Sequence, residues 1–505
     1  MTNLTVRRLV DKNDAEAPAI LAEAQHPLSH GQLGQHIDAT VLALNQFGIG
    51  RGDSVAFVLP NGPLAASAFL SLSCGATCAP LNPSYREEEF EFYLNDLEAR
   101  ALVVEEGSDS PATAAAKKLN IPILELKAHG DNAGAFTLQG EPGKAPTKGG
   151  LAEPDDVAMV LHTSGTTARP KIVPLSHRNV CASATNIAAT LRLQPQDVCL
   201  NVMPLFHIHG LIGALLSSIA AGASVHCTPG FNAMKFFAWL EQVKPTWYSA
   251  VPTMHQTILA RAARNQDIID KSTLRLIRSS SAALPPQVLA QLEEVFGVPV
   301  VESYGMTEAA HQMASNPLPP APRKPGSVGP GAGPEVAVMD EAGTLLPQGD
   351  TGEIVIRGEN VTVGYARNPE ANKTAFTDGW FRTGDQGRLD EQGYLYITGR
   401  LKEIINRGGE KISPREVDEV LLDHPDVAQV VVFGMPHPKL GEEIAAAVVL
   451  APGSSASEKE LRAFVSERLA DFKTPRKIVI LDEIPKGPTG KIQRIGLAAK
   501  LGLAG

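Results

Sequence analysis

The chain has 505 residues, 43% of them hydrophobic and 20% charged, which indicates a globular protein too long for a single core. Its net charge of −10 argues against nucleic acid as the main partner. From Arg400 onward there are 16 Lys/Arg and 15 Asp/Glu, whereas the first 399 residues carry 29 and 40. An anionic ligand would therefore need cations that are concentrated locally.

The cysteines, the N-terminal segment and the apolar runs indicate the cellular compartment in which the protein is expected. The five cysteines form no Cys-x-x-Cys pair, which favours reduced thiols over disulfides. The N-terminus lacks a basic segment followed by an apolar one, and no apolar run is long enough to span a membrane. We therefore expect a cytoplasmic protein without a membrane span, while the oligomeric state is left open.

The first 104 residues alternate between helix and strand patterns. Ser29 can cap a helix that has one apolar face. Further helices and buried strands are expected, in chain order, at 53–59 (strand), 62–73 (helix), 87–97 (helix) and 101–104 (strand). This alternation predicts an α/β fold with a largely parallel sheet. Residues 130–154 are rich in Gly, Pro and Lys and are expected to form a loop.

A hydroxyl-rich stretch begins at Thr163. Residues 156–162 predict a buried strand that leads into it, and Ser176 can cap a helix downstream. Hydroxyls and backbone N–H groups in such a loop can donate to phosphate oxygens, and Arg169 and Lys171 add positive charge. The spacing does not match the common Gly-x4-Gly-Lys-Ser/Thr loop. A hydroxyl cluster alone is typical of a polar surface loop, but the Pro-Lys pair at its end favours a polyphosphate site.

Two histidines, His207 and His209, follow in the segment Pro-Leu-Phe-His-Ile-His-Gly. Both can face one ligand only where the chain is extended. Nothing nearby supplies further metal ligands, so a metal site is not expected here. For His209, the alternative is a packed turn in which hydrogen bonds satisfy the ring.

Short strands and two polar segments occupy the region after residue 245. Strands are expected at 247–252, 274–278 and 298–302. Ser-Ser-Ser-Ala-Ala-Leu follows the second strand at 279–284, and Tyr-Gly-Met-Thr-Glu follows the third at 304–308. Residues 316–335 are rich in Pro and Gly and are expected to be an ordered connector.

The last part of the chain carries three more polar segments. They are Trp-Phe-Arg-Thr-Gly-Asp at 380–385, Gly-Arg-Leu-Lys at 399–402 and Pro-Lys-Gly-Pro-Thr-Gly-Lys at 485–491. By itself, each is typical of a turn or a solvated loop. The final hundred residues otherwise pattern as a small α/β domain, with strands at 429–433 and 445–450 and a helix at 458–469.

In this order, these segments resemble motifs of the adenylate-forming superfamily, which includes acyl-CoA synthetases, peptide-synthetase adenylation domains and beetle luciferases. The resemblance covers about residues 25–495, although Ala168 and Ile172 stand where the family usually has glycine. It implies a large N-terminal domain of layered β-sheets and helices (1–398). It also implies a hinge at 399–402 that includes Lys402, followed by a small, mobile α+β C-terminal domain (403–505).

The resemblance also implies cofactors and site residues. ATP and Mg²⁺ would serve adenylation, with the metal on Glu308, and coenzyme A would be a co-substrate that approaches Gly408 and Gly409. The catalytic residues would be Thr163, His207, Glu308 and Lys491. The nucleotide would be bound by Thr163, Ser164, Gly165, Thr166, Thr167, Lys171, Ser281, Ala282, Ser303, Tyr304, Gly305, Met306, Thr307, Asp385, Arg400 and Lys491.

The segments expected at the acyl site look like the oxalate–CoA ligase branch of plants and fungi. They are Pro-Leu-Phe-His-Ile-His-Gly, Ile-Arg-Ser-Ser-Ser-Ala-Ala-Leu and Met-Thr-Glu-Ala-Ala-His-Gln-Met. Four polar side chains would suit a small second carboxylate: His207, His209, Ser281 and His311. The alternatives are a medium-chain or aryl acyl-CoA ligase, an adenylation protein that loads a carrier protein, and a non-catalytic nucleotide-binding protein. The expected partners are thus a small carboxylate, ATP and CoA.

Overall fold

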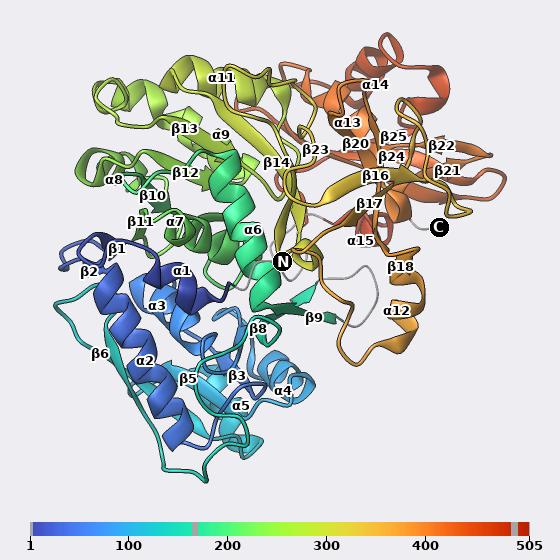
Figure 1. Ribbon diagram of the computed structural model, residues 1–505. Coiled ribbons are helices and arrows are strands. Elements are labelled where there is room, and N and C mark those ends of the chain that lie inside the picture. The colour runs from blue at the N-terminus through green and yellow to red at the C-terminus, as the bar shows by residue number, and fades with distance from the viewer. Residues whose placement is uncertain (1–3, 164–169, 486–492, 504–505) are drawn as a thin grey trace. The chain divides into compact units, whose positions relative to one another are not determined.

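The computed structural model describes residues 4–163, 170–485 and 493–503 (Figure 1). The chain forms two compact units. The larger unit comprises residues up to 163, 170–336 and 356–381, and the smaller unit comprises 337–355 and the residues from 382 onward. A division into compact units does not show that the units move. The hinge expected at 399–402 and the domains expected on either side of it therefore stay predictions.

The larger unit contains an eight-stranded sheet in the order β15-β14-β13-β12-β10-β11-β1-β2. The six strands from β14 to β1 pair in parallel, and β15 and β2 are antiparallel at the edges. The strands are β1 (Pro18–Leu21), β2 (Leu28–Ser29), β10 (Val198–Asn201), β11 (Ser224–Cys227), β12 (Trp247–Ala250), β13 (Leu276–Ser279), β14 (Val300–Met306) and β15 (His311–Ser315).

A seven-stranded sheet in the order β7-β6-β5-β3-β4-β8-β9 completes the larger unit's largely parallel α/β core, as predicted, with antiparallel strands β7 and β9 at its edges. Its strands are β3 (Ser54–Phe57), β4 (Thr77–Pro80), β5 (Ala101–Glu105), β6 (Ile123–Ala128), β7 (Phe136–Gln139), β8 (Val157–Thr163) and β9 (Lys171–Ser176). Two expectations were wrong here. The predicted loop at 130–154 contains the edge strand β7, and the hydroxyl-rich stretch leads into β9 before the helix begins.

Helices cover both faces of this second sheet because successive strand residues point to opposite sides. Val103 of β5 packs with residues of α2 and α3, whereas its neighbours Leu102 and Val104 pack with α4 and α5. Figure 1 shows these two pairs of helices around the strands. These helices are α2 (His30–Gln46), α3 (Pro63–Leu72), α4 (Glu87–Asp96) and α5 (Pro111–Lys118).

The N-terminal ends of two predicted helices show why the sequence folds as it does. The Ser29 side chain accepts from Gln32 N at the start of α2, and the Ser176 side chain accepts from Asn179 N at the start of α6. Both are capping boxes, which satisfy donors that the first turn leaves unpaired.

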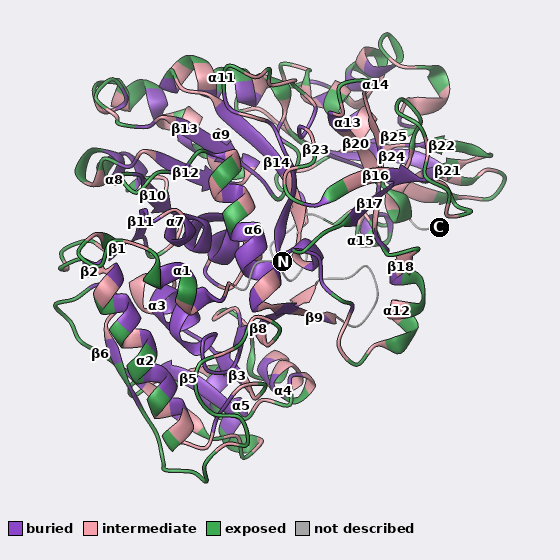
Figure 2. Cartoon of the chain, viewed as in Figure 1, coloured by how far each residue is buried: buried purple, intermediate pink, exposed green. Residues whose placement is uncertain are grey.

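Most of the other helices of the larger unit lie beside the eight-stranded sheet and its connections, whereas the helix at 369–375 lies beside the strand at 376–377. These other helices are α1 (Val6–Asp11), α6 (His177–Thr190), the π-helix η1 (His209–Leu216), α7 (Ser217–Ala220), α8 (Phe236–Val243), α9 (Pro252–Ala262), η2 (Ala263–Asn265), α10 (Gln266–Ile269), α11 (Pro286–Phe296), η3 (Thr307–Ala309) and α12 (Pro369–Ala375). Figure 2 shows β13 and most of β14 as buried between them.

Two further five-stranded sheets follow. The first has the order β16-β17-β19-β18, with β20 beside β19: β16 (Glu335–Met339), β17 (Gly352–Arg357), β18 (Phe376–Thr377), β19 (Trp380–Leu389) and β20 (Leu395–Arg400). The second, in the smaller unit, has the order β22-β21-β24-β23, with β25 beside β24: β21 (Ile405–Arg407), β22 (Glu410–Ile412), β23 (Val427–His437), β24 (Gly441–Leu450) and β25 (Lys477–Ile480).

The last helices pack on the second of these sheets through a shared apolar cluster. Val417 and Leu421 of α13 and Leu461 and Val465 of α14 contact the buried residues of β23 and β24. The helical segments of this region are η4 (Leu401–Glu403), α13 (Pro414–Leu422), α14 (Glu458–Ser466), η5 (Asp471–Lys473) and α15 (Leu497–Lys500).

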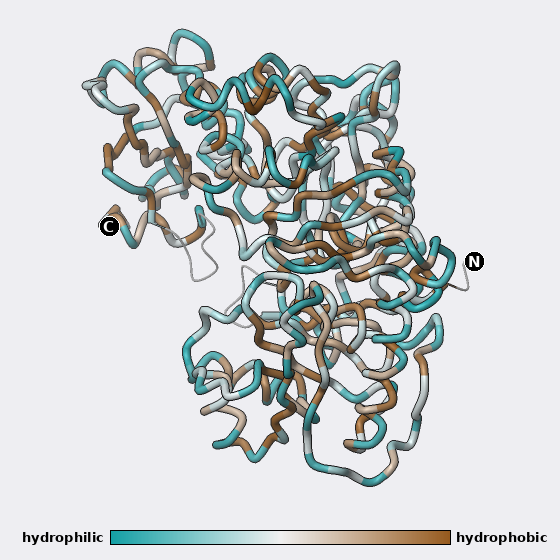
Figure 3. The backbone as a smooth tube through the Cα atoms, turned by 90° about the vertical axis from the view of Figure 1, so that its left-hand side faces the viewer, coloured by the Kyte–Doolittle hydropathy of each residue, from teal (hydrophilic) through white to brown (hydrophobic). Residues whose placement is uncertain are grey.

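Apolar residues are spread over several cores rather than gathered in one span. Figure 3 shows hydrophobic and hydrophilic stretches alternating along the whole tube. Among the described helices, none combines the length and the apolar character that a membrane crossing needs. The five cysteines, all in the larger unit, are free and buried.

Candidate active site

The predicted phosphate stretch begins and ends on two paired strands. Thr163 at the end of β8 lies opposite Lys171 at the start of β9 in an antiparallel register. Ser164, Gly165, Thr166 and Thr167 fall between them and lie outside the described residues, as does Lys491 near the C-terminus. Their predicted roles stay predictions.

Lys171 and Glu308, both predicted at the phosphates, meet at one aromatic ring. The Lys171 Nζ atom lies 4.3 Å from the centroid of Tyr365, and the Tyr365 hydroxyl donates to Glu308 Oε1 at 3.0 Å. Burial and the Glu308 charge raise the pKa of Tyr365, so its hydroxyl keeps its hydrogen. The Glu308 carboxylate is 6% exposed and is held in place by this bond. A cation and a carboxylate are therefore positioned by the same tyrosine, one over its ring and the other at its hydroxyl.

A polar cluster lies where the central strands of the eight-stranded sheet end. Ser249 of β12 is the register neighbour of Arg278 of β13, and both side chains are buried. Carboxyl ends of parallel strands are the usual place for a ligand in such a sheet. We call the following residues the polar cluster: His209, Ser249, Arg278, Ser281 and His311.

His209 connects two serines of the polar cluster. Its Nδ1 atom lies 2.9 Å from Ser281 Oγ, and its Nε2 atom lies 2.6 Å from Ser249 Oγ. The ring is 2% exposed. The backbone here is a turn that enters η1, not the extended chain needed to point His207 and His209 at one ligand. His209 therefore has the packed, hydrogen-bonded environment that was the alternative from sequence.

His311 stacks on His209 and contacts the buried arginine. The two ring centroids are 5.0 Å apart with planes 24° from parallel, and His311 Nε2 lies 3.0 Å from Arg278 Nη1. Burial, the Arg278 charge and His209 all lower the pKa of His311 well below its ordinary value. The imidazole is therefore neutral at physiological pH.

Arg278 itself is fully buried and contacts neutral acceptors. Besides His311, its Nη1 atom donates to Ser249 Oγ at 3.4 Å and its Nη2 atom donates to Gln312 Oε1 at 3.3 Å. Its Nε atom has no hydrogen-bond partner among the described residues. Burial lowers the pKa of Arg278 to about 9, which leaves the guanidinium charged at neutral pH. No carboxylate of the described chain is hydrogen-bonded to this cation.

The backbone around the polar cluster is strained. Ser281 has φ +72° and His311 has φ +100°, a region that residues with side chains rarely adopt. Such conformations cluster at functional sites, where the surrounding structure holds them. Gly213 of η1 lies against His311 and leaves no room for a side chain, since a Cβ there would lie 2.6 Å from His311 Nε2.

The remaining predicted residues of the larger unit lie on neighbouring segments. His207 is half-buried, with its ring 4.7 Å from that of Phe206. Ala282, beside Ser281, is exposed. Ser303 is buried, and its carbonyl accepts from Ser280 Oγ at 3.0 Å. The other four follow Ser303 along β14 and into η3: Tyr304, Gly305, Met306 and Thr307.

The predicted residues of the smaller unit that the structure describes form two pairs, with Lys402 between them in the chain. Asp385 and Arg400 face each other on β19 and β20, with Arg400 Nε 3.3 Å from Asp385 Oδ1. Lys402 is exposed in η4. Gly408 and Gly409 have φ +61° and +99° and form the turn between β21 and β22. A tight hairpin turn of this kind needs positive φ at both central positions, which accounts for the glycine pair without a ligand.

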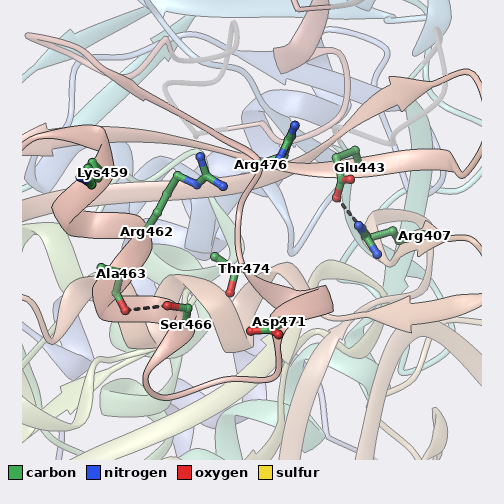
Figure 4. Close-up of a pocket in the computed structure, with 9 residues that line it drawn as sticks. All are labelled: Arg407, Glu443, Lys459, Arg462, Ala463, Ser466, Asp471, Thr474 and Arg476. Atoms are coloured by element: carbon green, nitrogen blue, oxygen red, sulfur yellow. Dashed lines mark hydrogen bonds and ion pairs between the residues drawn. The ribbon is translucent and has the colours of Figure 1, made fainter.

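The smaller unit also contains a pocket of about 470 Å³ that no prediction covered (Figure 4). Four cationic side chains line it, together with two acidic ones, and Arg407 Nε bonds Glu443 Oε1 at 2.5 Å. Arg407 directly precedes Gly408. The lining residues are Arg407, Glu443, Lys459, Arg462, Ala463, Ser466, Asp471, Thr474 and Arg476.

Sequence reasoning missed three side chains that the structure brings to the predicted sites. Arg278 carried a signal, because it is the last residue of the predicted strand 274–278 and directly precedes the run of serines. Ser249 and Tyr365 carried none, since a serine or tyrosine in a short strand or loop is common. Their positions follow from strand pairing and from a connection that is long in sequence.

Comparisons with known proteins agree with this geometry. Residues 7–366 match the family model "AMP-binding enzyme", and residues 416–491 match "AMP-binding enzyme C-terminal domain". The chain is 47% identical to a probable CoA ligase, CCL9, of Humulus lupulus over 97% of this chain and 95% of the relative. It is 46% identical to an oxalate–CoA ligase of Arabidopsis thaliana over 96% of each.

A solved structure supports the same conclusion. The crystal structure of ATP-bound MatB from Rhodopseudomonas palustris is 31% identical and covers 99% of each chain with a TM-score of 0.88. The predicted superfamily, with its large domain of sheets and helices and its small C-terminal domain, is thereby confirmed. The chain belongs to the AMP-binding enzyme family.

Proposed function

We propose that this chain is an ATP-dependent acid–CoA ligase whose acid is oxalate. One oxygen of the acid attacks the α-phosphorus of ATP, pyrophosphate leaves, and an acyl-adenylate forms. The CoA sulfur then attacks the acyl carbon and AMP leaves, which gives the thioester. The family match and the similarity to the Arabidopsis oxalate–CoA ligase support this class of reaction.

The first step is limited by charge, because an anion attacks a polyanion. Two unit charges 4 Å apart repel by about 4 kcal/mol at an effective dielectric of 20. Lys171 is a described cation near Glu308, and Arg169 and Lys491 are expected to add charge from outside the described residues. Positioned cations of this kind lower the barrier by stabilising the charge that develops on phosphate oxygens.

Glu308 fits a magnesium ion. Its carboxylate is hydrogen-bonded by Tyr365 and supplies the hard oxygen ligand that Mg²⁺ prefers beside phosphate oxygens. When bound, the ion would neutralise phosphate charge. Asp385, on β19, has the two acceptor oxygens that ribose hydroxyls need.

For the second step, we propose the glycine pair 408–409 as the place where the pantetheine chain passes. We propose 399–402 as the hinge about which the C-terminal domain moves between the two half-reactions.

We also propose a cytoplasmic location, which the reduced, buried cysteines suit.

The observation that carries the choice of oxalate is the polar cluster at the carboxyl ends of β12 and β13. The cluster holds the buried Arg278, whose Nε atom has no hydrogen-bond partner among the described residues and to which no carboxylate of the described chain is hydrogen-bonded. An alkyl chain would leave this cation without a negative partner, whereas the second carboxylate of oxalate would supply one. Among the cluster residues, only Ser281 is exposed in the structure, so it is the donor closest to an entering acid.

The test is a panel of carboxylates in a CoA-dependent AMP-release assay. Oxalate is compared with acetate, malonate, hexanoate and a cinnamate, at matched concentrations and with free CoA as acceptor. Oxalate is expected to have the highest kcat/KM. A preference for hexanoate or the cinnamate would overturn oxalate and favour the medium-chain or aryl alternative. AMP release that requires a carrier protein instead of CoA would overturn the ligase itself.

A further inference from the structure

We propose that Arg278 is a positioning residue that sets the direction of the hydrogen bonds in the polar cluster, so that the cluster presents donors to an acid with a second negative charge. The proposal rests on the proposed function for the identity of the acid. The orientation of the hydrogen bonds follows from the chain's own contacts.

The first step concerns His311. A guanidinium group can only donate, so the 3.0 Å contact between Arg278 Nη1 and His311 Nε2 makes Nε2 an acceptor. A neutral imidazole carries one hydrogen, which must then be on Nδ1. Arg278 thereby fixes His311 as the Nδ1–H tautomer, with a donor on the side away from the guanidinium.

The second step concerns Ser249. Its oxygen accepts from Arg278 Nη1 and lies 2.6 Å from His209 Nε2. If His209 donated from Nε2, its hydrogen and the Arg278 Nη1 hydrogen would both point at the Ser249 oxygen, beside the guanidinium charge. The favoured arrangement has the Ser249 hydroxyl donating to His209 Nε2, because its hydrogen then points away from the guanidinium charge.

The third step continues the chain to the exposed end of the cluster. With Nε2 accepting, His209 carries its hydrogen on Nδ1 and donates to Ser281 Oγ at 2.9 Å. The Ser281 hydroxyl hydrogen is then available to a ligand. The bonds run in one direction, from Arg278 through Ser249 and His209 to the exposed Ser281.

The charge of Arg278 favours an anionic acyl group for the same reason. The guanidinium is fully buried and hydrogen-bonded to neutral atoms, and no carboxylate of the described chain is hydrogen-bonded to it. A substrate with a negative charge at both ends lowers the cost of burying this cation, whereas a neutral acyl group does not. The substrate class is thus a small dicarboxylate.

The experiment compares oxalate with oxamate, in which a neutral amide of similar shape replaces the second carboxylate. ATP–pyrophosphate exchange is measured for the wild-type enzyme and for Arg278→Met and Arg278→Lys, and an inhibition constant against oxalate replaces turnover where oxamate is not adenylated. Arg278→Met is expected to reduce the oxalate preference roughly 10- to 100-fold through a higher KM for oxalate, with the KM for ATP unchanged. Arg278→Lys should recover part of the preference because it keeps the charge.

A second measurement does not depend on the acid. Nitrogen NMR of enzyme labelled with ¹⁵N-histidine distinguishes a ring nitrogen that carries hydrogen from one that does not, and His311→Gln identifies the signals of His311. The wild-type enzyme is expected to show hydrogen on Nδ1 of His311, and Arg278→Met is expected to move it to Nε2. This result would support the proposal even if oxalate were not the substrate.

Two results would overturn the proposal. One is an unchanged His311 tautomer in Arg278→Met, and the other is an equal loss of oxalate and oxamate use in both Arg278 variants. Should Arg278→Met fail to fold, Arg278→Gln removes the charge while keeping a polar side chain, and Arg278→Lys remains the variant that keeps the charge.

Discussion

Arg275 and Arg278 lie three positions apart around the start and the middle of β13, and their surroundings differ completely. Arg275 forms a two-pronged ion pair with Asp197, with distances of 2.7 and 2.6 Å. It also donates to the carbonyls of Leu191 and Arg192. Arg278 is more deeply buried and is bonded to an imidazole, a hydroxyl and an amide.

The partner of a buried charge therefore indicates the role of that charge better than its degree of burial does. An arginine whose charge is matched by a carboxylate holds the fold together. An arginine held by neutral atoms keeps a net positive field, which is costly for folding and useful for binding an anion. Three experiments test this contrast between the two arginines.

The largest effect is expected for Arg275→Met, which should lower the free energy of unfolding by about 3 kcal/mol. The reason is that Asp197, whose side chain is 5% exposed, would keep only its bonds from Thr246 and the Gln194 backbone. Urea unfolding followed by tryptophan fluorescence measures the change. All three tryptophans lie in the larger unit, so the signal reports on the part that contains the ion pair.

The control is the double variant Arg275→Met with Asp197→Asn, which removes the stranded charge and should be less destabilised than the single variant. The dependence of the free energy of unfolding on pH gives a second check. Burial works to raise the pKa of Asp197, but hydrogen bonds from Arg275, Thr246 and the backbone outweigh it and hold the pKa below its usual value. This contribution to stability is present above the unfolded pKa of about 4 and is lost as pH falls through the folded value. A similar acid dependence in Arg275→Met would contradict the ion-pair role.

The second effect is expected for Gln312→Glu, which would give Arg278 the kind of partner that Arg275 already has. Gln312 Oε1 lies 3.3 Å from Arg278 Nη2, so a carboxylate there would offset the guanidinium charge. The kcat/KM for oxalate should fall roughly 10- to 100-fold, and that for oxamate should fall less. The panel of exchange assays measures both.

Gln312→Met is the matched control for the lost amide. The Gln312 side chain also donates to Thr190 Oγ1 and to the Ala332 carbonyl, each at 3.1 Å, and both variants lose those bonds. Only the glutamate adds a negative charge. An equal loss of oxalate preference in the two variants would mean that the charge of Arg278 plays no part in selection.

The smallest effect is expected for Ser281→Ala, which removes the last donor of the chain of hydrogen bonds. Because Ser281 is exposed, water can take over part of its role, and a decrease of about tenfold in kcat/KM for oxalate is expected. Ser280→Ala is the control from the same run of serines. Its hydroxyl is buried and donates to the Ser303 carbonyl, so its loss should lower stability and leave the oxalate preference unchanged. Matching changes in selectivity for the two serines would refute the assignment of Ser281 as the terminal donor.

Local features of the fold could be predicted from the sequence. The caps at Ser29 and Ser176 and the buried strands around residues 55 and 160 follow from neighbouring residues alone. The strand β9 was missed because Pro174 interrupts an otherwise strand-like stretch, yet its pairing with β8 holds it in place. The edge strand β7 was missed because glycines and prolines surround it.

The site was predictable in part, and for a related reason. His209, Ser281 and His311 could be placed near one another by family resemblance, and their contacts in the structure agree with that grouping, while their roles stay predictions. The partner of His311 could not be found from local sequence. Arg278 and His311 are brought together by the pairing of β13 with β14 and of β14 with β15, and no short motif encodes that register.

The burial of the cysteines has a practical consequence at the bench. Thiol-specific dyes react with thiolates, and burial raises the pKa of Cys74 and Cys227 to about 12 and those of the other three thiols as well. The five thiols of the native enzyme should therefore not react with such a dye. The absorbance of the dye would then report only the thiol of free coenzyme A as it is consumed. In denaturant, the same dye would react with five thiols per chain. For each variant, the difference between the readings with and without denaturant therefore measures how much of the sample is folded.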